Sequence, residues 1–98
     1  MNRVYYYLID KQGKAYQGVG ADTVSISTEA DVADFRKRVW GKNKDGLLKG
    51  FSAVQLEVFA KKDDSIDSTK KPLNASGPVG DRHADEDTAL YVVVPKKT

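Results

Sequence analysis

The sequence predicts an α+β domain in which one amphipathic helix covers one face of a mixed sheet of four or five strands. Segments rich in β-branched and aromatic residues occur near both ends of the chain, at residues 4–9 and 89–94. A single stretch, residues 29–40, has the apolar spacing of an amphipathic helix, and one such helix can cover only one face of a sheet. The 98 residues, 40% of them hydrophobic, fit a single domain, residues 1–98, with a modest core.

The first two strands are predicted to form a hairpin. In residues 4–9, "VYYYLI", apolar side chains alternate on both faces, which is typical of a strand inside a sheet. Asp10 and Gly13 in "DKQGK" supply turn chemistry. The return strand is expected over residues 16–27, where Val24 and Ile26 alternate with polar residues, with a bend near Gly18 and Gly20.

The helix is predicted to begin near Glu29 and to end at Gly41. Thr28 and Asp31 have the spacing of a capping box, with Asp in place of the usual Glu. Val32, Phe35 and Val39 recur at i, i+3 and i+7 and form one apolar stripe. The "GKNKDGLLKGF" that follows is a connector whose apolar residues should pack beneath the sheet.

A third strand is predicted from Val54 in "AVQLEVFAKKDD", because Val54, Leu56 and Val58 alternate with polar residues and should face the core. Residues 62–88 are expected to form a long irregular loop with one short turn of helix or an edge strand. The apolar "ALYVVV" at the end belongs in the sheet centre, parallel to the first strand. That arrangement is the ubiquitin-like β-grasp. The residues expected to be buried are Leu8, Ile26, Phe35, Val39, Leu56 and Val92.

The composition offers little catalytic chemistry, and we expect no enzyme activity, metal site or cofactor. The chain has no cysteine, and its one histidine, His83, lies in "DRHADED" between Asp81, Asp85, Glu86 and Asp87. We interpret this stretch as a solvated loop, because hard-cation loops space their ligands around a glycine turn. Ser65, His83 and Asp67 can be written as a triad, but nothing places the serine on a tight elbow.

Partner classes are also restricted by the sequence. A net charge of +2 does not by itself indicate nucleic-acid binding, and no apolar run approaches the length of a membrane span. The N-terminal "MNRVYYYLID" is too polar for the core of a signal peptide. Basic residues cluster toward the helix end, as an ordinary solvated face or as a contact face for phosphates or an acidic partner. These residues are Arg36, Lys37, Arg38, Lys42 and Lys44.

The order of these segments resembles the N-terminal header domain of the Crinkler effectors, a family described in oomycetes and found in other eukaryotes. The strand and turn "VYYYLIDKQGKAYQGV" are similar to the family's opening, and "VSISTEADVADFRKRV" is similar to its "V-x-I" strand and "T-x-x-D-L-K-x-x-I" helix. The counterpart of its "L-x-L-F-L-A-K" motif is "VQLEVFAKK", which contributes Val54, Leu56, Val58, Phe59, Ala60 and Lys61. The closing "ALYVVVP" is similar to a strand near the end of the family's header.

The resemblance covers almost the whole chain and has clear departures. Valine fills two leucine positions, Glu57 replaces an aromatic residue, and Phe59 is an insertion before Ala60. The resemblance implies a non-catalytic, ubiquitin-like module that serves secretion and host-cell translocation, or acts as an adaptor for a C-terminal effector domain. It implies a secreted protein that reaches the host cytoplasm or nucleus and binds protein partners. The alternative is a generic intracellular β-grasp interaction domain. Since a buried strand is poorly accessible to a receptor, we favour a structural role for the motif over a signal role.

Overall fold

A computed structural model describes residues 2–67, 69–79, 83 and 85–95, and in this range the chain forms one mixed four-stranded sheet with one main helix. The strands are β1 (Asn2–Ile9), β2 (Asp22–Ile26), β3 (Glu57–Phe59) and β4 (Leu90–Val93). Their order across the sheet is β2-β1-β4-β3. Strand β4 runs parallel to β1, whereas β2 and β3 are antiparallel to their neighbours. The predicted α+β class and the central, parallel last strand are confirmed, and the arrangement is consistent with a β-grasp fold.

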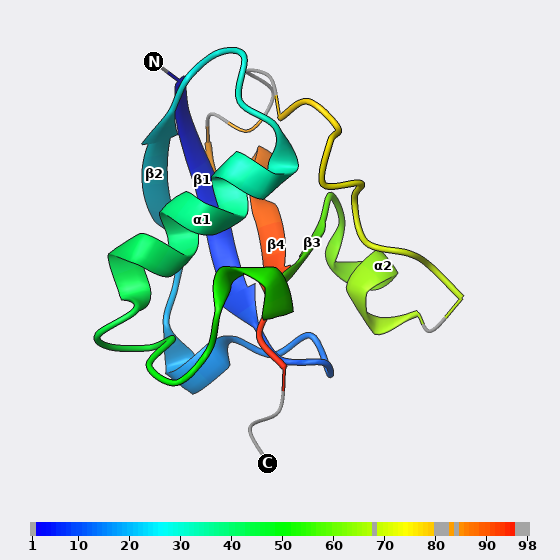
Figure 1. Cartoon of the computed structure of the whole chain (residues 1–98). Coiled ribbons are helices and arrows are strands. Elements are labelled where there is room, and N and C mark those ends of the chain that lie inside the picture. The colour runs from blue at the N-terminus through cyan, green and yellow to red at the C-terminus, as the bar shows by residue number, and fades with distance from the viewer. Residues whose placement is uncertain (1, 68, 80–82, 84, 96–98) are drawn as a thin grey trace.

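The main helix, α1 (Val32–Asn43), crosses one face of the sheet (Figure 1) and buries its predicted apolar stripe there. Val32, Phe35 and Val39 are at most 3% exposed, and the Phe35 ring meets the Tyr6 ring edge-on at 5.9 Å. All six residues that we expected in the core are buried. A smaller cluster of Ile9, Phe59 and Val93 lies apart from this core. Alternate residues of β1 belong to the two clusters, as the two-residue period of a strand requires.

Both predicted ends of the helix were wrong by two or three residues. Asp31 caps α1: its Oδ1 accepts from the Asp34 backbone N–H at 2.9 Å, and Asp34 accepts in return from Asp31 N–H. Asp31 is held in extended conformation by a bridge to Pro78, so the helix cannot begin earlier. At the other end the helix passes through Gly41, because the last turn is anchored by Lys42 and Asn43. These two side chains hydrogen-bond to β2 and to Tyr6.

The return strand is shorter than predicted. Tyr16–Gly18 form a 3-10 turn, η1, in which Gln17 and Gly18 have positive φ angles of 52° and 74°. The expected bend near Gly18 is therefore confirmed, but strand pairing along β2 begins only at Asp22. Val24 and Ile26 are buried as expected.

Among its described residues, the long segment before β4 contains two short helices, α2 (Lys62–Ile66) and η3 (Glu86–Thr88). The expected short turn of helix is confirmed in α2. Val79 is buried, and Val58 C=O accepts from Leu73 N–H at 2.7 Å, which ties the segment to β3. None of the helices in the described part of the chain combines the length and apolar character needed to cross a bilayer.

Candidate functional site

The motif segment is divided between a 3-10 turn and the edge strand β3. Ser52 and Gln55 close the turn η2 (Ala53–Gln55), since Ser52 N–H donates to Gln55 Oε1 at 2.7 Å. This turn leaves Val54 78% exposed, so the prediction that Val54 starts the strand and faces the core was wrong. Only after the turn does the chain enter the sheet, with pairing from Glu57 to Phe59.

The apolar remainder of the motif is structural. Leu56 and Val58 are each 1% exposed in the main core, and Phe59 is buried in the second cluster. Arg36 crosses from α1 and its Nη1 donates to Leu56 C=O at 3.3 Å. These side chains hold β3 against α1 and β4, and their burial removes them from the reach of any receptor.

The last two motif residues, unlike Leu56, Val58 and Phe59, are exposed. Ala60 and Lys61 follow β3 directly, and Lys61 is the residue that precedes α2. Together with Asp63, Asp87 and Tyr91 they line a shallow cavity of about 280 Å³. Of the motif residues, Ala60 and Lys61 therefore combine exposure with a concave surrounding.

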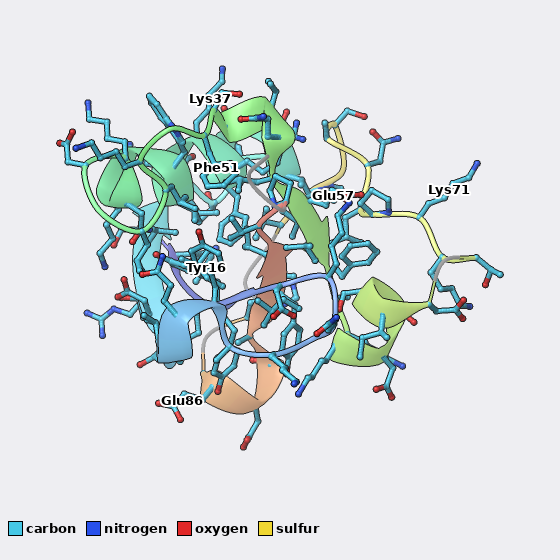
Figure 2. All side chains as sticks on the ribbon, turned by 90° about the horizontal axis from the view of Figure 1, so that it is seen from below. Tyr16, Lys37, Phe51, Glu57, Lys71 and Glu86 are labelled. Carbon is cyan, nitrogen blue, oxygen red and sulfur yellow. The ribbon has the colours of Figure 1, made fainter. Side chains whose placement is uncertain are left out.

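A pair of tyrosines lies beside this cavity, on the strands β1 and β4. Tyr7 and Tyr91 stack with ring centroids 5.4 Å apart and planes 16° apart, and both are half-buried against the second cluster. Desolvation and the nearby carboxylates of Glu86 and Asp87 raise the pKa of Tyr7. Figure 2 shows Glu86 on the opposite side of the sheet from Lys37 of α1.

The five basic residues predicted as a possible contact face do not all lie together. Arg36 is directed to the β3 side and hydrogen-bonds to Leu56, whereas Lys42 lies on the β2 side and pairs with Asp22 at 2.8 Å. Lys44 lies over the Trp40 ring, 5.7 Å from its centroid. Lys37 and Arg38 remain exposed and together line a second cavity, described below. Helical geometry explains the split, because residues six apart lie on different sides of a helix.

A polar network that the sequence did not reveal links the end of α1 to the sheet. Asn43 donates to the Tyr6 hydroxyl at 3.1 Å, and that hydroxyl donates to Asp22 at 3.3 Å. Desolvation raises the pKa of Tyr6 to about 12. Partial burial alone would raise the pKa of Asp22, but hydrogen bonds from Lys42, Thr23 and Tyr6 outweigh it and leave the pKa below its usual value. The network fixes the end of α1 against β1 and β2.

The side chains weighed as catalytic or metal-binding candidates are engaged in local hydrogen bonds. Ser65 Oγ donates to Lys62 C=O at 2.6 Å, Asp67 accepts from Thr69, and the His83 ring is 2.7 Å from Thr88 C=O. Asp85 accepts from Thr88 N–H, whereas Asp81 lies outside the described residues. Over the described ranges, no group of three or more histidine or acidic side chains has the arrangement of a metal site.

Comparison with family models and with curated proteins found no significant match. The similarity to the Crinkler header stays a prediction that rests on the sequence segments quoted above.

Proposed function

We propose that this chain is a non-catalytic, ubiquitin-like N-terminal module of a Crinkler-type effector. It serves secretion and translocation into host cells, or it is an adaptor for a C-terminal effector domain that acts in the host cytoplasm or nucleus. The observation that supports this best is that the motif segment has a buried part and an exposed part. Leu56, Val58 and Phe59 are buried and hold the edge strand, while Ala60 and Lys61 are exposed at its end.

The motif can therefore stabilise the fold through its buried residues and be recognised through its exposed ones. A receptor reads exposed side chains and backbone, so the recognised part of the motif is the Ala60–Lys61 end together with the cavity beside it. Lys61 adds a flexible cation next to the carboxylates of Asp63 and Asp87, and Tyr91 adds an amphipathic ring. A partner protein with a short side chain for the cavity and a carboxylate for Lys61 would fit this surface.

The test is delivery of a reporter enzyme fused behind residues 1–98 in a microbe that secretes Crinkler effectors. Wild-type fusion should accumulate in host cells, and Lys61→Glu should lower that accumulation several-fold without changing the melting temperature. Lys71→Glu is the matched control, because Lys71 is also an exposed lysine but lies in the loop away from the cavity. Equal delivery of the wild type, of Lys61→Glu and of a reporter without the module would refute the proposal.

A generic intracellular β-grasp interaction domain is the second candidate, and the stacked pair of Tyr7 and Tyr91 favours it. Half-exposed aromatic rings on a sheet face suit protein binding in any compartment. Under this alternative, replacing Tyr91 with alanine abolishes binding of a cellular partner while Lys61→Glu has no effect. Lys61→Glu therefore distinguishes the two candidates, because Tyr91 belongs to both surfaces.

A further inference from the structure

We propose that the groove between β2 and α1 binds an extended, acidic segment of a partner protein, which adds a strand to the free edge of β2. This site is distant from the motif segment and does not depend on the proposed role in delivery. Three features of the described residues support it: an unpaired strand edge, an apolar groove next to that edge, and two exposed cations at the rim.

The unpaired edge follows from the register of β1 and β2. Tyr5 N–H donates to His83 C=O, on the side away from β2, so the Tyr5–Thr23 pair is not a hydrogen-bonded one. Thr23 C=O accepts from Lys42, which also places it on the outer edge. Hydrogen-bonded pairs alternate along an antiparallel ladder, so the backbone groups of Ser25 point outward as well.

The edge is closed at one end and open at the other. Thr23 N–H is taken by the Asp22 carboxylate and Thr23 C=O by Lys42, so this ion pair blocks strand addition there. No hydrogen bond to the backbone of Ser25 from outside β1 is found among the described residues. Figure 1 shows no strand beyond β2. A partner strand therefore pairs at Ser25 and at the following Ser27 N–H.

The groove beside this edge has the size and lining for one or two apolar side chains. It has a volume of about 270 Å³ and is lined by Ile26 and Ala30, which are buried, and by Ser27. In an added strand every second side chain points to the α1 side, where it meets this lining. A β-branched or leucine side chain at such positions fits the groove.

The charged residues at the rim of the groove favour an acidic partner. Lys37 and Arg38 line the groove and are exposed, against the single carboxylate of Asp34. Asp34 also accepts from Asp31 N–H at the start of α1, where a negative charge is favoured by the helix dipole. The rim therefore has a net positive charge and attracts acidic residues flanking the apolar ones. Nucleic acid or free phosphate would use the cations but neither the strand edge nor the apolar lining.

The proposal is tested by selection from a displayed library of random peptides of about 12 residues. Selected peptides should combine alternating β-branched or leucine residues with Asp or Glu, and the purified peptides should shift the backbone amide NMR signals of Ser25 and Ser27. The double variant Lys37→Glu/Arg38→Glu should weaken binding roughly tenfold. The double variant Lys70→Glu/Lys71→Glu is the matched control, since it reverses two adjacent exposed cations elsewhere and should leave affinity unchanged.

A backbone variant separates strand addition from attraction between charges. Ser25→Pro removes the outward N–H that a partner strand needs, and a proline is tolerated at such an edge position. We expect Ser25→Pro to lose peptide binding, with an unchanged amide spectrum in α1 as the check on folding. The proposal is overturned if no peptide is enriched, if the shifts map to Tyr7 and Tyr91 instead, or if inorganic phosphate displaces peptides that still bind Ser25→Pro.

Discussion

Leu56 and Val54 belong to the same sequence motif but should differ sharply in their contribution to stability. Leu56 is 1% exposed in the main core, and shortening a buried leucine to alanine costs about 2–5 kcal/mol. Val54 is 78% exposed on the turn η2, so Val54→Ala should change the free energy of unfolding by less than about 0.5 kcal/mol. For a domain of this size, 1 kcal/mol corresponds to roughly 4–8 °C in melting temperature, which makes the Leu56→Ala shift at least about 8 °C.

Urea unfolding followed by tryptophan fluorescence measures both variants. Trp40 is the only tryptophan, and its indole N–H donates to Phe51 C=O at 2.6 Å, so its emission reports the packing of α1 against the connector. Equal midpoints for the two variants would refute the reasoning, because they would mean that the motif does not change from an exposed turn to a buried strand between residues 54 and 56.

Three further predictions concern the local structure. Asp31→Ala removes the acceptor at the start of α1 and should cost about 1 kcal/mol in urea unfolding, whereas Asp31→Asn should retain most of the stability. Gly13 has a φ of +81° and lies against Ile66, so Gly13→Ala should cost about 1–2 kcal/mol, and no loss would show that the turn relaxes. Burial raises the pKa of Tyr6 to about 12, so the folded state holds the phenolic proton more tightly than the unfolded chain. Wild type should lose about 1–2 kcal/mol relative to Tyr6→Phe as the pH rises from about 10 to 12, after allowance for solvent screening, and parallel pH profiles would contradict this.

The order of the sheet and the residues of its core could be predicted from the sequence, because both follow from which apolar side chains must be buried. The run "ALYVVV" has apolar side chains on both faces, which only a central strand can bury, and its parallel place beside β1 is observed. Likewise, the spacing of Phe35 and Val39 identified the buried stripe of the helix. Such patterns are reliable because a shift of one residue in the register of a strand would move all of its apolar side chains from the core to solvent.

Element ends and the grouping of charges were less predictable, because single tertiary contacts decide them. The alternation from Val54 to Val58 is also compatible with a turn followed by a shorter strand, and the Ser52–Gln55 hydrogen bond selects that outcome. The start of α1 depends on a bridge between Asp31 and a proline 47 positions later in the chain. The separation of Arg36 from Lys42 depends on which strand each side chain reaches.

The Ala60–Lys61 end of the motif was identified from the sequence, but the cavity beside it was not. Both residues are exposed, directly after the buried Phe59, where the sequence changes to charged residues. The cavity beside them was not predictable, because Asp87 and Tyr91 reach it from a segment more than 25 residues away in the chain. A groove between β2 and α1 could not be read from the sequence for the same reason.

The complete coding sequence of the gene tests the central claim most directly. A Crinkler-type module is joined to a C-terminal effector domain, so we predict that the reading frame continues beyond "VVVPKKT" into a second domain with effector or nuclease-like features. A transcript whose frame stops at Thr98, or one that continues into an ordinary intracellular enzyme, would contradict the Crinkler assignment and leave the generic interaction domain as the better account.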